Sequence, residues 1–185
     1  MKHEIKIGGT ILFIAVAQFL IFLNIAAFVY PNYSVSNNYI SDLGVGKYSY
    51  IFNVSIVILG ILVIISTYLL RSLSRYFWIL LTIAGIGAMG VGIFNENTGT
   101  PHTIFSLLTF LFSSLTTYAV FAKQKSLISG IWAFLGTVSL AAIVLFTAGM
   151  DLGIGKGGME RMIVIPILIF GLGFSTFMIA KDNEK

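Results

Sequence analysis

Outside its two ends this chain of 185 residues carries few side chains suited to chemistry. They are four acidic residues and one histidine: Asp42, Glu96, Asp151, Glu160 and His102. A histidine flanked by carboxylates can be a general base, an oriented hydrogen-bond partner, or one ligand of a divalent metal completed by Asp and Glu. Asp42, Glu96 and His102 are therefore candidate metal ligands, with Glu160 as a further ligand or acid.

The elements that would position these residues are transmembrane helices. The chain is 57% hydrophobic and 10% charged, with a mean hydropathy of +0.97, which leaves too little polar surface for a soluble globule. Six apolar stretches are long enough to cross about 30 Å of hydrocarbon. They are Ile7–Tyr30, Tyr48–Leu70, Phe77–Phe94, His102–Ala122, Leu127–Gly149 and Arg161–Ala180. Because backbone amides need partners in lipid and the runs do not alternate, we predict an all-α polytopic membrane bundle of six transmembrane helices forming a single domain over residues 1–185.

The basic residues predict the orientation of this bundle. Eight of the eleven Lys and Arg residues lie at the chain ends or in two alternate connections, and only Lys47, Lys156 and Arg161 lie in the other three connections. The positive-inside rule then places both termini in the cytoplasm of a multi-pass cell membrane protein. The four acidic residues would share the outer side. Since a compact bundle brings its loop ends together, we expect Asp42, Glu96, His102 and Glu160 to converge there.

Composition also excludes several classes of function. The absence of cysteine removes disulfides, thiolate nucleophiles and cysteine metal sites. The net charge of +4 fits topology signals and anionic headgroups, so we expect membrane lipids as partners and no nucleic acid. No ionisable residue lies deep in any span, which disfavours an ion pump or proton relay.

The first and third outer connections contain a short repeat. Asp42-Leu43-Gly44-Val45-Gly46-Lys47 recurs as Asp151-Leu152-Gly153-Ile154-Gly155-Lys156. Glycine amides and a lysine can hold a phosphate or carboxylate, which is one interpretation. Gly-rich turns between membrane helices also resemble one another without any shared ligand, which is the other.

Three short motifs at the helix ends resemble the six-helix membrane family known as domain of unknown function 998, and more distantly the Frag/DRAM/Sfk group. The motifs are Ile40-Ser41-Asp42-Leu43-Gly44, Gly92-Ile93-Phe94-Asn95-Glu96 followed by His102, and Glu160-Arg161. The pattern departs at Asn95, where the family would have proline. The resemblance implies a six-helix fold with Ser41, Asp42, Glu96, His102 and Glu160 as marked positions. Because the wider group is connected with lipid remodelling, it also implies a lipid as substrate class.

Three hypotheses on function remain open at this point. The first is a lipid-binding or assembly protein, or an accessory subunit working with other membrane subunits, in which Asp42, Glu160 and Arg161 pair with His102 or Lys47. The second is a lipid-active hydrolase or acyl transferase that uses Ser41 as nucleophile or hydroxyl donor, with a divalent metal or water held by Asp42 and Glu96 beside His102. Transport of a small solute is the third.

Overall fold

The structure is a computed structural model that describes residues 2–180, and most of them are helical. In chain order the elements are α1 (Lys2–Val29), the 3-10 turn η1 (Ser41–Gly44), α2 (Ser49–Leu69), α3 (Arg75–Ile93), the 3-10 turn η2 (Glu96–Thr98), α4 (Thr100–Gln124), α5 (Leu127–Thr147) and α6 (Gly155–Ala180). All six long helices are long and apolar enough to cross a membrane. The prediction of an all-helical bundle with six helices long and apolar enough to span a membrane is confirmed.

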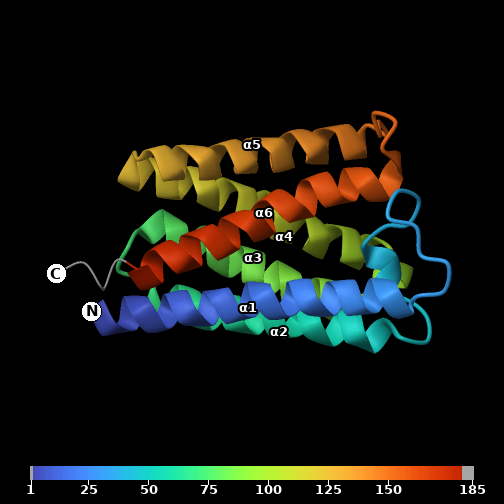
Figure 1. Ribbon diagram of the computed structural model, residues 1–185, viewed down its shortest axis with the longest axis horizontal. Coiled ribbons are helices and arrows are strands. Elements are labelled where there is room, and N and C mark those ends of the chain that lie inside the picture. The colour runs from blue at the N-terminus through green and yellow to red at the C-terminus, as the bar shows by residue number, and fades with distance from the viewer. Residues whose placement is uncertain (1, 181–185) are drawn as a thin grey trace.

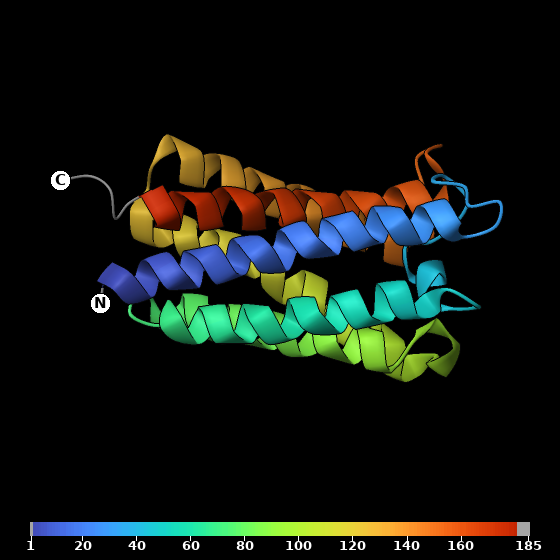
Figure 2. The ribbon, with the colours of Figure 1, turned by 60° about the horizontal axis from the view of Figure 1, so that its bottom comes forward.

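The helices form a ring that closes on itself. Each long helix packs against the next one in the chain, and α6 packs back against α1 (Figure 1). A further contact between α4 and α6 divides the ring, which leaves α5 at its edge beside these two helices. The start of α1 and the end of α6 lie at one end of the bundle in both views (Figures 1 and 2).

The two ends of the bundle differ in their connections. One end, which we call the turn end, holds the short connections 70–74 and 125–126 together with the start of α1 and the end of α6. The loop end holds the longer connections 30–48, 94–99 and 148–154. All the candidate site residues of the sequence lie at the loop end.

Four helices, α1, α3, α4 and α6, begin earlier than the apolar runs indicate, and the last two carry site residues. The helix α4 begins at Thr100, with Gly99 in the N-cap position, and this keeps His102 in its first turn as expected. The helix α6 begins at Gly155, six residues before Arg161, so that Glu160 lies within the helix. Polar and glycine residues form this extra turn because the connection before α2 packs over it, as the contacts of Gly157 show: its amide donates to the Ser36 carbonyl at 2.8 Å.

The chain between α1 and η1, residues 30–40, lies across the loop end, and we call it the strap. Arg161 fixes it, donating to the carbonyl oxygens of Val35 at 2.8 Å and Asn38 at 3.3 Å. The hydroxyl of Ser36 donates to the Ile154 carbonyl at 2.8 Å. Since strap and α6 are far apart in sequence, these bonds decide where η1, with Ser41 and Asp42, will lie.

Close helix packing below the strap relies on small residues. A side chain at Gly87 would collide with the backbone amide of Thr109 on α4, at 2.6 Å. A side chain at Gly92 would collide with the Asn53 carbonyl on α2, at the same distance. The glycines of α3 thus let its two neighbours approach from opposite sides, as expected for membrane helices.

Candidate functional site

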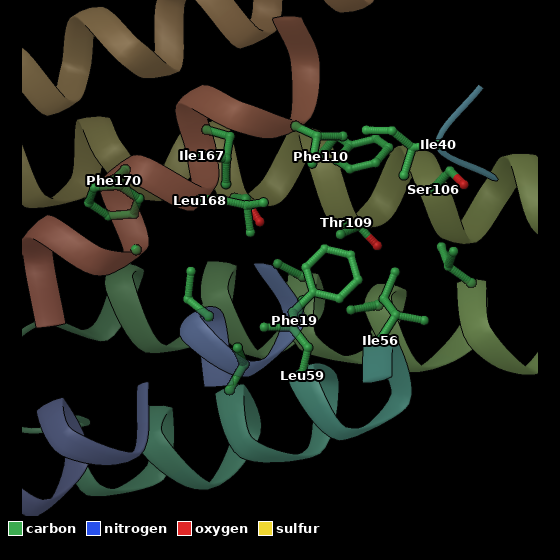
Figure 3. A pocket seen from close by; sticks show the side chains of 18 of the residues that line it. Phe19, Ile40, Ile56, Leu59, Ser106, Thr109, Phe110, Ile167, Leu168 and Phe170 are labelled. Carbon is green, nitrogen blue, oxygen red and sulfur yellow. The ribbon is translucent and has the colours of Figure 1, made fainter. Parts of the chain in front are cut away.

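Two cavities meet at the loop end of the bundle. The first, of about 90 Å³, is internal and is lined by α1, α2, α3, α4 and α6, largely with apolar side chains. Figure 3 shows Phe19, Ile56 and Leu59 facing Phe110, Ile167 and Leu168 across it, with Ile40 and Ser106 toward one end. The second, of about 340 Å³, is a groove between α4, α5 and α6. Leu107, which is 47% exposed, lines this groove, so the groove reaches the surface of the bundle.

The same few residues line both cavities. They are Ser41, His102, Ser106, Phe110 and Glu160. His102 and Ser106 share one face of α4, as their spacing predicts. The polar side chains of the site therefore stand at the junction of the internal cavity and the groove.

His102 is held in one orientation by the end of α3. Its Nδ1 atom lies 2.8 Å from the carbonyl oxygen of Phe94. Because a carbonyl only accepts, Nδ1 carries the proton, and in the neutral ring Nε2 is then a hydrogen-bond acceptor. The rings of Phe94 and Phe105 stack with centroids 5.3 Å apart, which locks the end of α3 to the first turns of α4. His102 is 9% exposed.

Glu160 joins α6 to the strap. It is 8% exposed, and its Oε2 accepts a short hydrogen bond from the amide of Ile40. A buried carboxyl needs such partners because burial without them is costly. Ile40 is itself 3% exposed and lines the internal cavity, so Glu160 places the residue before Ser41 against that cavity.

Glu96 and Asp42 form a carboxyl pair. Burial raises the pKa of Glu96 above its ordinary 4.5, and the charge and hydrogen bond of Asp42 raise the pKa further. The Ser41 hydroxyl and His102 act on the Glu96 pKa in the opposite direction. Glu96 Oε2 is buried without a hydrogen-bond partner.

Asp42 holds neighbouring residues of the site in place through hydrogen bonds. Its Oδ2 accepts from Asn38 Nδ2 at 2.9 Å and from the Tyr39 amide at 3.0 Å. Within residues 2–180, Asp42 is not among the residues that line either cavity. η1 is further tied to α2 because Asn53 Nδ2 donates to the Gly44 carbonyl at 3.0 Å. Asp42 thus positions Glu96 and the strap.

The basic residues at the loop end have partners other than the carboxylates. Arg161 donates to three carbonyl oxygens and to the hydroxyl of Tyr33 at 2.5 Å. Lys156 Nζ lies 4.3 Å from the ring centroid of Tyr39, and Lys47 Nζ lies 5.2 Å from that of Tyr48. The hypothesis of a lipid-binding or assembly protein paired Asp42, Glu160 and Arg161 with His102 or Lys47, whereas these contacts of Arg161 and Lys47 are to carbonyls, a hydroxyl and aromatic rings.

The two copies of the repeat differ in structure. The first folds into η1, whereas in the second the Gly153 amide donates to Asp151 Oδ1 at 3.0 Å within an exposed turn. Only the second glycine has a similar backbone conformation in both copies, with φ of 88° at Gly46 and 77° at Gly155. Because that conformation favours glycine, the likeness is explained by the turn that precedes α2 and α6.

The arrangement gives no support to a metal site. Among residues 2–180, no three His, Asp or Glu side chains come together in a group that could hold a metal ion. The metal roles of His102, Asp42 and Glu96 stay predictions, and the chemistry below is derived without them.

The sequence did not indicate the groove or the role of the strap. The groove wall on α5, which includes Ile143, Phe146 and Thr147, looks like any apolar helix face. Arg161 stood out only as a charge beside Glu160, and nothing in the sequence indicates that carbonyls 123 and 126 residues away would accept its hydrogen bonds.

Comparison with known proteins gives one match. A family model described as a protein of unknown function, DUF998, matches residues 13–176, which is most of the chain. No curated protein and no solved structure matches it.

Proposed function

We propose a function from the site itself, because this chain belongs to the DUF998 family, whose description assigns no activity. The protein is an integral membrane protein with six spans. It binds a membrane lipid, with the headgroup at the polar junction at the loop end and acyl chains in the apolar cavities. It acts as a lipid-binding, assembly or accessory subunit.

One observation carries this proposal: Ser41, His102 and Glu160 line both the internal cavity and the groove. A lipid has a polar head and apolar chains, and it needs a site where polar groups border apolar space. The exposed groove residues Thr103, Leu107 and Thr147 give a lateral entrance between α4 and α5. A lipid could enter through it from the bilayer without crossing water.

The distribution of Lys and Arg supports an orientation for this site. With the turn end and its basic residues in the cytoplasm, both termini are cytoplasmic and the loop end faces outward. The protein would then meet lipids of the outer leaflet of the cell membrane. Insertion of a reporter after Asn37 and after Lys125 tests this, since only the former would be accessible from outside.

Lipid binding is tested by blocking the junction. Ser106→Leu adds bulk where the two cavities meet, whereas Ala119→Leu adds the same bulk to a separate cavity at the turn end. Native mass spectrometry of the purified protein should show less bound lipid in Ser106→Leu and an unchanged amount in Ala119→Leu. Full lipid retention by a folded Ser106→Leu protein would contradict the proposal.

A second function, a lipid hydrolase or acyl transferase, is favoured by the hydrogen bond between Ser41 and Glu96. In that reaction Glu96 takes the hydroxyl proton, Ser41 Oγ attacks an ester carbonyl, and Glu96 returns the proton to the leaving alcohol oxygen. The resulting acyl-serine passes its acyl group to water or to a second lipid.

An assay of lipid turnover distinguishes the two functions. Wild-type protein, Ser41→Ala and Asp151→Asn are incubated with diacyl lipid, and the release of fatty acid or lysolipid is followed. Release by the wild type and Asp151→Asn that disappears in Ser41→Ala supports the enzyme. Lipid that is retained unchanged by all three supports binding alone.

A further inference from the structure

We infer that the lipid headgroup held at this site donates hydrogen bonds, through an ammonium or a hydroxyl group. The inference rests on the proposed lipid binding and specifies the chemical class of the ligand. It follows from what the junction of the cavities presents to a ligand. Glu160, His102 and Glu96 offer acceptors, the Ser41 and Ser106 hydroxyls can accept as well as donate, and the neighbouring cations are engaged elsewhere.

The acceptors are built into the walls. Glu160 and His102 are each more than nine-tenths buried and line both cavities. With Nδ1 of His102 donating to Phe94, Nε2 of the neutral imidazole is left as an acceptor. Glu160 accepts from the Ile40 amide, yet a carboxylate has about four acceptor positions, so capacity remains for a ligand.

Glu96 adds a further acceptor on the groove side. Its Oε2 atom is buried and has no hydrogen-bond partner. An unsatisfied buried oxygen is costly, and a donor on a bound headgroup would remove that cost.

The cations at the loop end are not placed to neutralise a phosphate inside the site. Arg161 is engaged by Val35, Asn38, Gly157 and Tyr33. Lys156 is exposed, and its Nζ lies over the ring of Tyr39, a residue of the groove wall. A phosphodiester could therefore lie at the rim beside Lys156 with its alcohol or amine substituent turned inward.

A bare phosphate monoester would fit this junction poorly. Phosphate sites are commonly made from Arg, Lys and free backbone amides. Here the amide of Ile40 already donates to Glu160, and three carboxyls lie close by. Like charges in a partly buried site repel, which disfavours phosphatidic acid.

Two matched pairs of lipids test the inference with the full-length protein in detergent. Phosphatidylethanolamine is compared with phosphatidylcholine, which has the same charge but no N–H donor. Phosphatidylglycerol is compared with phosphatidylmethanol, which has the same charge but no hydroxyl. All four carry the same acyl chains, and binding is measured by native mass spectrometry with phosphatidic acid as a fifth lipid.

We expect the donating lipid of at least one pair to bind about tenfold more tightly, the factor that one charge-assisted hydrogen bond supplies. The pair that shows the preference identifies the ammonium or the hydroxyl as the donor. Glu96→Gln should reduce that preference, and Asp151→Asn, the same change in an exposed turn, should preserve it.

Equal binding within both pairs, or tightest binding of phosphatidic acid, would overturn the inference while leaving the proposed lipid binding in place. No retention of any of the five lipids would overturn lipid binding itself. Because the lipid pairs are compared on the wild-type protein, the test holds even if Glu96→Gln does not fold.

Discussion

The loop end and the turn end of the bundle contain cavities of similar size and different chemistry. The groove at the loop end measures about 340 Å³, and a cavity between α3, α4 and α6 at the turn end measures about 330 Å³. The first is lined by Glu96, His102 and Glu160, whereas the polar groups of the second are Ser74, Lys123 and Gln124. Volume alone does not distinguish them, and the difference lies in the groups at their walls.

The length of the connections explains this difference. The short turns 70–74 and 125–126 can only reverse the chain. The strap and η1 are long enough to fold back over the helix ends, where they bring Ser41 and Asp42 beside Glu96. Rings of Phe77 and Phe174, with centroids 5.0 Å apart, line the turn-end cavity instead. Function would thus depend on one end of the molecule, and the comparison can be tested by matched substitutions.

The largest effect is expected from the arginines. Arg161→Ala removes bonds to three carbonyls and a hydroxyl and should cost about 3 kcal/mol of stability, since hydrogen bonds to charged groups contribute about 1.5 to 3 kcal/mol. Arg71→Ala at the turn end removes a bond to Tyr68 and should cost about 0.5 kcal/mol. Thermal unfolding in detergent measures both. Equal losses would contradict a strap held by Arg161.

Glycines at the two ends should respond with opposite sign. A side chain at Gly157 would overlap the carbonyl oxygens of Asn38 and Val35 in the strap, so Gly157→Ala should cost about 2 kcal/mol. At Gly130 the nearest atom is 3.8 Å away, and Gly130→Ala should stabilise by about 0.5 kcal/mol through helix propensity. The same unfolding assay tests the pair, and a tolerated Gly157→Ala would show that the strap is loosely placed.

Stability should depend on pH through Glu96. Because its pKa in the folded protein is raised above 4.5, the unfolded chain loses this proton first as pH rises. Stability is therefore lost from about pH 4.5 upward until the folded pKa is passed. Glu96→Gln cannot ionise, so its melting temperature relative to wild type should rise over that range. A difference that is independent of pH would argue against the carboxyl pair.

The smallest effect belongs to the turn end. Lys125 follows α4 in the left-handed conformation, with φ of 46°. Glycine adopts this conformation without a steric penalty, so Lys125→Gly should stabilise by about 0.5 kcal/mol. Bound lipid, followed by native mass spectrometry, should stay the same. A change in bound lipid would mean that the two ends of the bundle are coupled.

The sequence predicted the fold well because its strongest signals are local. Apolar runs of the required length predicted all six helices, and Pro101 after Thr100 predicted His102 in the first turn of α4. The start of α6 was predicted six residues late, since Gly155, Lys156 and Gly157 do not resemble a membrane helix. That turn is stabilised by the strap, which is a distant segment of the chain.

The candidate site was only partly predictable. In the structure, Ser41, His102 and Glu160 line both cavities and Glu96 lines the groove. Asp42 is not among the lining residues of either cavity. Sequence patterns can select polar residues at helix ends, but they cannot separate a residue that lines a cavity from one that supports it. That distinction depends on the contacts of Asp42 with Asn38 and Tyr39.

The order of the chain has a consequence for biosynthesis. Glu160 belongs to α6, the last helix to be made, and the internal cavity has no complete wall before α6 packs between α1 and α5. A chain with only its first five helices inserted would leave Ile40 without its carboxylate partner and the strap without Arg161. The walls of the site are therefore complete only when the last helix has packed, and a chain that lacks α6 would lack the site.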